Sequence, residues 1–259
     1  MRHSIAVQNV GVRYKVHHEQ HAHLRNAIFN VLRGRGGSKD LWALDGVSFT
    51  LNDGDILGIV GRNGAGKSTL CLLLSGIIHA DRGSVQVNGS LSTLLGLGAG
   101  FVRDLSGRDN VYLNASFLGL SKRQVDERFD SIVEFAELEE FIDTPIRQYS
   151  SGMVARLGFA VAASIEPEIL IVDEVLGVGD EAFKAKCQQR MKEMMDKAKA
   201  IVIVTHSSEM VTELCNKALW LDTGKVKMFG DPETVIAGYR AFQKEWRARR
   251  VLGPAALTQ

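Results

Sequence analysis

The sequence contains 259 residues, of which 45% are hydrophobic and 24% charged, and it carries a formal net charge of +1. This is an ordinary globular composition, and a charge so close to zero excludes a general electrostatic attraction to nucleic acid or anionic lipid. The N-terminus lacks the apolar core of a signal peptide, and no stretch has the composition of a spanning helix. The three cysteines, Cys71, Cys187 and Cys215, are widely separated, which favours buried reduced thiols. We therefore expect a cytosolic chain.

The first predicted elements are a strand over residues 4–14 and a histidine-rich stretch that follows it. This stretch holds four of the seven histidines, namely His17, His18, His21 and His23. Their spacing lacks the paired ligands of a typical metal site. Apolar side chains then recur at helical spacing from Leu24 to Leu32. The residues leave three alternatives open: a metal site, a helix packed in the core, and a helix on a membrane surface.

The rest of the chain alternates between strand-like and helix-like segments. Residues 47–51 and 56–60 flank an Asp-Gly turn, and an Asn-Gly turn follows residues 84–87, so both places predict hairpins. Helical periodicity dominates from residue 106 to 147, and a terminal helix is expected over residues 236–250. Two short apolar runs, at 169–172 and 200–204, are typical of buried parallel strands. The alternation predicts an α/β fold with a parallel sheet.

A glycine-rich motif lies where an apolar strand gives way to a helical run. Residues 61–68 fit G-x-x-x-x-G-K-[ST], with the strand 56–60 before them and the helical run 69–77 after them. Successive backbone N–H groups of such a loop point at phosphate oxygens, and the helix N-terminus adds a positive dipole. Lys67 is placed to bridge the β- and γ-phosphates, and Ser68 to offer its hydroxyl to Mg²⁺. The predicted nucleotide-binding residues are Gly61, Asn63, Gly64, Ala65, Gly66, Lys67, Ser68 and Thr69.

Two acidic residues, Asp173 and Glu174, end the apolar run at 169–172. The carboxyl ends of parallel strands face the ligand in such sheets, so both acids are expected at the nucleotide. Asp173 suits Mg²⁺ through its water shell, and Glu174 suits a general base that polarises the attacking water. His206 follows the next strand and is expected to contact the γ-phosphate. The alternative is an acidic helix start and a structural histidine.

The order of these motifs resembles the ATP-binding subunits of ABC transporters. The phosphate loop, a helical segment, "YSSGM" at 149–153, "ILIVDE", Asp180 and His206 follow one another as in that family, over about residues 5–230. The resemblance implies a P-loop NTPase fold of the ABC type, with a RecA-like core, an antiparallel β subdomain and a helical subdomain. It places a nucleotide-binding domain at residues 1–235, with the helical subdomain at about 97–158, and a C-terminal helix and basic tail at 236–259.

The resemblance also assigns roles to further residues. Ser150, Ser151 and Gly152 stand where the family has its signature LSGGQ, with Ser151 in place of a glycine. It implies that they bind the ATP held by a second copy in a head-to-tail dimer, and that Asp180 belongs to the D-loop. Tyr14 stands where the family stacks an aromatic ring on adenine. The family's glutamine that touches Mg²⁺ and the permease has no counterpart in this sequence, where Gly96, Leu97 and Gly98 occupy the neighbourhood.

A narrower resemblance concerns the transported substrate. "LGLGAGF", "LSGRDN" and "DEVLGVGD" are similar to segments of the ATPases that export O-antigen, capsule, teichoic acid and galactan (the Wzt type). This implies an ATPase at the cytoplasmic face of the inner membrane, held there by integral-membrane permease subunits. Only about thirty residues follow Gly230, so we expect a member without the C-terminal carbohydrate-binding domain.

In that group a helix at the permease entrance occupies the insertion that corresponds here to residues 15–40. The resemblance therefore identifies residues 22–33 as a gate helix that guides lipid-linked polysaccharide. The alternatives are an ABC ATPase for another substrate, a non-transport ABC ATPase that acts on ribosomes or DNA, and a small-molecule kinase. The single nucleotide domain and the near-neutral charge argue against a nucleic-acid partner.

Overall fold

The computed structural model describes residues 3–16, 39–94, 98, 100–173 and 180–252. Its larger sheet has six strands in the order β5 (Leu91–Thr93), β6 (Ile169–Asp173), β7 (Ala200–Val204), β3 (Ile56–Val60), β8 (Lys217–Asp222) and β9 (Lys225–Gly230). The first five are parallel to one another, and β9 is antiparallel to β8. The apolar runs of β3 and β7 are almost entirely buried, as expected of strands covered on both faces. The predicted α/β class is confirmed.

The smaller sheet is antiparallel and contains β2 (Lys39–Asn52), β1 (His3–Val16) and β4 (Arg82–Val87) in that order. Both predicted hairpins are wrong, because β2 and β3 belong to different sheets, as do β4 and β5. The turn between β2 and β3 has the expected tight geometry, with the Asp55 carboxylate accepting the N–H of Asn52 at 2.6 Å. The chain nevertheless leaves one sheet there and enters the other, since the apolar run of β3 needs cover on both faces.

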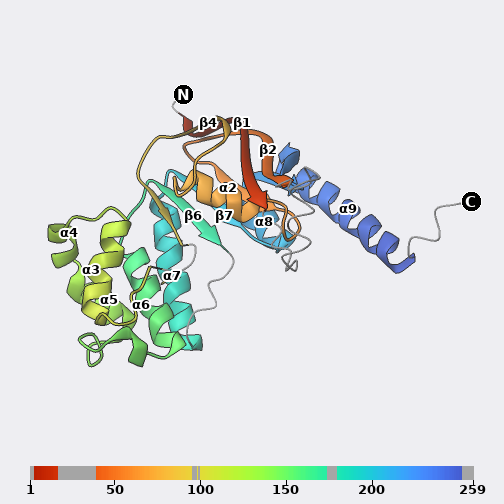
Figure 1. Ribbon diagram of the computed structural model, residues 1–259. Coiled ribbons are helices and arrows are strands. Elements are labelled where there is room, and N and C mark those ends of the chain that lie inside the picture. The colour runs from red at the N-terminus through yellow and green to blue at the C-terminus, as the bar shows by residue number, and fades with distance from the viewer. Residues whose placement is uncertain (1–2, 17–38, 95–97, 99, 174–179, 253–259) are drawn as a thin grey trace, which may run out of the picture.

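Helix α2 (Lys67–Leu74) lies between the two sheets (Figure 1). Its side chains Leu70, Cys71 and Leu74 join a core to which β1, β2, β3, β6, β7 and β8 also contribute. The helix is shorter than the predicted run 69–77 at its end, and it begins two residues earlier. Because both sheets pack on α2, the loop at its N-terminus is positioned by both.

A separate helical cluster lies on one side of the sheets (Figure 1). It contains α3 (Gly107–Phe117), α4 (Lys122–Asp126), α5 (Phe129–Ala136), the 3₁₀ turn η1 (Ile146–Gln148) and α6 (Ser151–Ala163). These elements have a core of their own, to which Val111, Val125, Ile132 and Leu157 belong. Helix α7 (Glu181–Lys197) follows β6 in the chain and packs against α6. It thus connects the cluster with the larger sheet.

The C-terminal part contains α8 (Ser208–Leu214) and the long helix α9 (Pro232–Leu252). Helix α9 begins four residues before the predicted start, because the Asp231 carboxylate accepts the N–H of Thr234 at 2.9 Å and Pro232 suits the first helical position. In Figure 1, α9 extends away from the body on the side opposite the helical cluster. In the part of the chain that the structure describes, no helix has the length and apolar character needed to cross a membrane.

The three cysteines are buried thiols, as predicted. Burial raises the pKa of Cys187 to about 11 and that of Cys215 to about 12.

Candidate functional site

Three predicted segments meet at one edge of the larger sheet. Within the sheet, Asp173 at the end of β6 is level with Val204 at the end of β7, and Ile59 of β3 is level with Val204 as well. The glycine-rich loop follows β3, and His206 follows β7. The adjacent strands β6, β7 and β3 thus bring these three segments to the same carboxyl edge, which is where α/β sheets bind ligands.

A cavity of about 660 Å³ lies at this edge. Six of its lining residues belong to the predicted loop or the start of α2: Asn63, Gly64, Gly66, Lys67, Ser68 and Thr69. Its other lining residues come from β2, from the end of β7 with His206, and from the β8–β9 turn: Leu41, Trp42, Ala43, Val204, His206, Thr223 and Gly224. The volume falls within the usual range for small-molecule sites.

Gly66 fixes the shape of the loop at the N-terminus of α2. Its φ is 104°, and a Cβ there would lie 2.6 Å from the carbonyl oxygen of Ala43 on β2. The loop is also tied to the β8–β9 turn, because the N–H of Gly224 donates to the Ala65 carbonyl at 3.0 Å. In turn the N–H of Asp45, on β2, donates to the Gly224 carbonyl at 2.8 Å. Elements of both sheets therefore hold the loop in place.

The amine of Lys67 lies within the loop. Lys67 is 8% exposed, and its Nζ donates to the Gly61 carbonyl at 2.7 Å and to the Arg62 carbonyl at 3.3 Å. Ser68 in the next position is exposed, and Thr69 is half-buried. A cation, a helix N-terminus and a cavity thus coincide, and together they suit a phosphorylated ligand.

The predicted signature turn starts helix α6. Ser150 is the N-cap of α6, and its Oγ accepts the N–H of Met153 at 3.1 Å. The helix therefore begins at Ser151. Both Ser150 and Ser151 are exposed, and the Ser150 hydroxyl can still donate its proton while it caps the helix. Among the described residues that line the 660 Å³ cavity, none comes from this turn.

Tyr149, which occupies the first position of the signature, has a structural role. Its ring packs on the core of the helical cluster, and its hydroxyl donates to the carbonyl of Phe141 at 2.7 Å. Burial raises the pKa of Tyr149. The contact is close enough that a Cβ at Gly107 would lie 2.2 Å from the Tyr149 hydroxyl oxygen. Tyr149 thus anchors the signature turn to the start of α3.

Asp180 begins α7 and contacts α6. Its Oδ1 accepts the N–H of Phe183 at 2.9 Å, and its other oxygen pairs with the guanidinium of Arg156 on α6. The Phe183 N–H and the Arg156 charge hold the pKa of Asp180 below its usual value. Arg156 also pairs with Glu137 at 2.6 Å and lies over the Phe183 ring at 4.7 Å. Arg156 therefore links the predicted D-loop aspartate to the helix that follows the signature turn.

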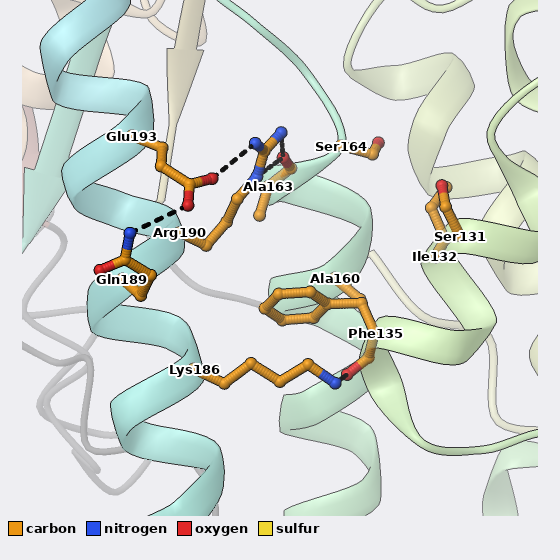
Figure 2. A pocket seen from close by; sticks show the side chains of 10 residues that line it. All are labelled: Ser131, Ile132, Phe135, Ala160, Ala163, Ser164, Lys186, Gln189, Arg190 and Glu193. Atoms are coloured by element: carbon orange, nitrogen blue, oxygen red, sulfur yellow. Dashed lines mark hydrogen bonds and ion pairs between the residues drawn. The ribbon is translucent and has the colours of Figure 1, made fainter.

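Two further cations on α7 contact the ends of other helices (Figure 2). Lys186 donates to the Phe135 carbonyl near the end of α5 at 3.0 Å. Arg190 donates to the Ala163 carbonyl at the end of α6, from Nη2 at 2.8 Å and from Nε at 3.0 Å. Both contacts suit the negative end of the helix dipole. They flank a second cavity of about 470 Å³ between α5, α6 and α7. No sequence motif marks this interface.

Comparison with known proteins identifies the family. The family model described as "ABC transporter" matches residues 44–177, which is more than half of the chain. This chain belongs to the ABC transporter family. As a member of it, the chain is an ATP-binding and ATP-hydrolysing transporter subunit.

The relatives of this ABC chain include several export ATP-binding proteins. The O-antigen export system ATP-binding protein RfbB of Klebsiella pneumoniae is 41% identical over 91% of this chain and 97% of its own length. The protein of the same name from Myxococcus xanthus is 44% identical, but the matched part is 55% of its length. The teichoic acids export ATP-binding protein TagH of Bacillus cereus is 39% identical over 95% of this chain and 44% of its own length.

Solved structures support the fold. An ATP-binding subunit of an ABC transporter superposes with a TM-score of 0.66 at 21% identity, over 91% of this chain and 92% of that one. A dimeric bacterial ABC transporter cassette superposes with a TM-score of 0.65 at 22% identity, over 88% of this chain and 98% of that one. The ABC-type fold expected from the motifs is therefore confirmed.

The aromatic residues near the cavity were only partly foreseen. Tyr14 is 43% exposed and pairs across the small sheet with Leu41, which lines the cavity, although Tyr14 itself is not among the lining residues. Trp42 does line it, and the guanidinium carbons of Arg13 and Arg82 lie 5.7 and 4.7 Å from the centroid of its ring. No motif marks Trp42, because its place depends on how β2 reaches the loop.

Several expectations concern residues outside the described part. Glu174, Gly96 and Leu97 fall there, as do the histidine-rich stretch and the predicted gate helix at 22–33. Gly98 is described, with a φ of 78°.

Proposed function

We propose that this chain is the ATPase subunit of an exporter of lipid-linked cell-surface polysaccharide. The observation that carries the ATPase part is the 660 Å³ cavity, where the Gly61–Thr69 loop and His206 meet at one edge of the sheet. The substrate class is supported by the relatives, whose names refer to O-antigen and teichoic acid export. O-antigen and teichoic acid are both cell-surface polymers, so the class is better supported than any single member of it.

Within the cavity, the loop N–H groups and Lys67 would hold the phosphates of ATP. The exposed hydroxyl of Ser68 and the position of Asp173 at the end of β6 fit a Mg²⁺ site. Bound there, Mg²⁺ would neutralise charge on the phosphate oxygens. Glu174 would take the proton of the attacking water, and His206 would contact the γ-phosphate. Tyr14, next to Leu41, is the candidate for adenine stacking.

The exposed turn Ser150–Gly152 would complete the site of a second copy. Its helix N-terminus and hydroxyl suit a γ-phosphate, and these groups do not reach the cavity of their own chain. A head-to-tail dimer with two ATP molecules would bring each turn to the partner's nucleotide, with Asp180 nearby. A permease would hold the dimer at the cytoplasmic face of the membrane, and residues 22–33 would guide the lipid-linked polysaccharide at its entrance.

The central test replaces the proposed base. Glu174→Gln should bind ATP and accumulate as a dimer, while phosphate release slows by about 10²–10⁴-fold, the usual worth of general base catalysis. Asp196→Asn, at the exposed end of α7, is the matched control and should keep the wild-type rate. Lys67→Ala should weaken ATP binding itself. Wild-type turnover by Glu174→Gln would refute the assignment.

The transport part has its own test. The chain should co-purify with a multi-span permease, and deletion of residues 22–33 should abolish polysaccharide export while ATP hydrolysis continues. Association with ribosomes in the absence of any membrane partner would instead favour the non-transport alternative.

A further inference from the structure

The C-terminal helix α9 contacts the phosphate loop. The guanidinium carbon of Arg62 lies 3.6 Å from the centroid of the Trp246 ring, well inside the roughly 6 Å within which a cation and an aromatic face attract. It is the shortest such contact among the described residues. Both side chains are half-buried, so the pair is partly shielded from water.

Arg62 occupies a position on which the rest of the loop depends. Its carbonyl accepts the N–H of Ala65 at 3.0 Å, which closes the turn of the loop. The same carbonyl accepts Nζ of Lys67 at 3.3 Å. The backbone of Arg62 therefore supports both the turn and the catalytic lysine, and any contact that fixes the Arg62 side chain restricts that backbone.

Helix α9 is itself firmly attached to the body. Tyr239 is buried, and its ring and that of Phe242 pack on Trp220 of β8, at 5.7 and 5.1 Å between ring centroids. Arg240 pairs at 2.5 Å with Glu209 in the first turn of α8. These contacts occupy the helix just before Trp246. They hold the indole in a defined place beside the loop.

We propose that Trp246 is a positioning residue of the nucleotide site. By stacking on Arg62, it keeps the loop in its ligand-ready shape and so raises the affinity for ATP. The reason is preorganisation: a loop that is already ordered loses less conformational freedom when the phosphates bind. This inference rests on the proposed ATP site. It adds a residue from the far end of the chain that no motif indicates.

The test compares Trp246→Ala with wild type in ATP titrations of the whole protein. The dissociation constant for ATP should rise by about three- to tenfold, as the usual range of cation–π strength implies. Trp246→Phe should restore part of the affinity, because it keeps an aromatic face. Lys244→Ala, at an exposed position two residues earlier on α9, is the matched control. It leaves the ring contacts with Trp220 and the Arg62–Trp246 pair in place, and it should change the constant by less than about twofold.

A double-mutant cycle tests whether Arg62 and Trp246 affect ATP binding through their mutual contact. If the two side chains act through each other, Arg62→Ala combined with Trp246→Ala should weaken binding no more than the stronger single variant. Fold-changes that multiply would overturn the proposal, and so would an unchanged dissociation constant in Trp246→Ala. A second measurement needs no nucleotide: hydrogen exchange at the amides of residues 61–67 should be faster in Trp246→Ala, and equal rates would contradict the inference. If wild type itself fails to bind ATP, the proposed function fails instead.

Discussion

The segment between β5 and α3 depends on one buried side chain, Asn110. Asn110 is fully buried, and its Oδ1 accepts the N–H of Val102 at 2.7 Å. Its Nδ2 donates to three carbonyls, those of Val102 at 3.0 Å, Leu105 at 3.3 Å and Ser106 at 2.8 Å. We predict that Asn110→Ala will strongly destabilise the protein.

The magnitude follows from the groups that lose their partners. All three carbonyls keep a second donor: Leu105 N–H for Val102, Ile146 N–H for Leu105 and Asn110 N–H for Ser106. Only the N–H of Val102 loses its hydrogen bond. An orphaned N–H costs about 1–3 kcal/mol, and the lost amide bonds and packing add roughly 1 kcal/mol, so the free energy of unfolding should fall by about 2–4 kcal/mol.

Urea unfolding followed by circular dichroism measures this change, with the slope of the transition checked for two-state behaviour. Asn114→Ala, one turn further along α3, is the matched control. Its amide makes one long bond of 3.3 Å to the Asn110 carbonyl, so the loss should be under about 0.5 kcal/mol.

Asn110→Asp is the sharper variant. It would place a carboxylate against three carbonyls, which raises its folded pKa above the unfolded value, so this variant should be least stable at neutral pH and recover as the pH falls. Equal losses for Asn110→Ala and Asn114→Ala would refute the reasoning.

Two other predictions concern the signature turn and the thiols. Ser151→Gly should retain most of the ATPase rate, since the helix N-terminus and the Ser150 cap remain; a collapse in phosphate release would show that the Ser151 side chain itself acts. Burial raises the pKa of Cys187 to about 11 and of Cys215 to about 12. At pH 8 both thiols should therefore resist iodoacetamide in the folded protein and react after denaturation. Mass spectrometry of labelled peptides measures this, and fast labelling of the native protein would contradict it.

Local signals were sufficient where one segment determines its own structure. The apolar run at 56–60, the glycines that follow and the helical pattern after them predicted β3, the loop and α2 in the right order. Asp173 and His206 were placed at the same edge because parallel strands align their carboxyl ends, and the register of β6 with β7 agrees.

The same local signals failed where the sheet that a strand joins depends on its pairing with distant strands. The turn before β3 has hairpin chemistry, yet β3 pairs with β7 and β8, which follow more than a hundred residues later. Trp42, Gly224 and Trp246 have positions set by the packing of sheets and helices. Trp42 lies on β2, in the other sheet, and Gly224 and Trp246 come from the last part of the chain. Nothing in their neighbouring residues distinguishes them from ordinary strand, turn or helix positions.

The placement of Gly66 between two sheets also has a consequence for folding. Gly66 packs against the Ala43 carbonyl, and the adjacent Ala65 carbonyl is bound to the turn at Gly224. These contacts join segments far apart in the sequence, and closing such long loops is slow. The loop should therefore become native only after both sheets have docked, late in folding. ATP would then leave the refolding rate unchanged and slow unfolding, because it can bind only the finished structure.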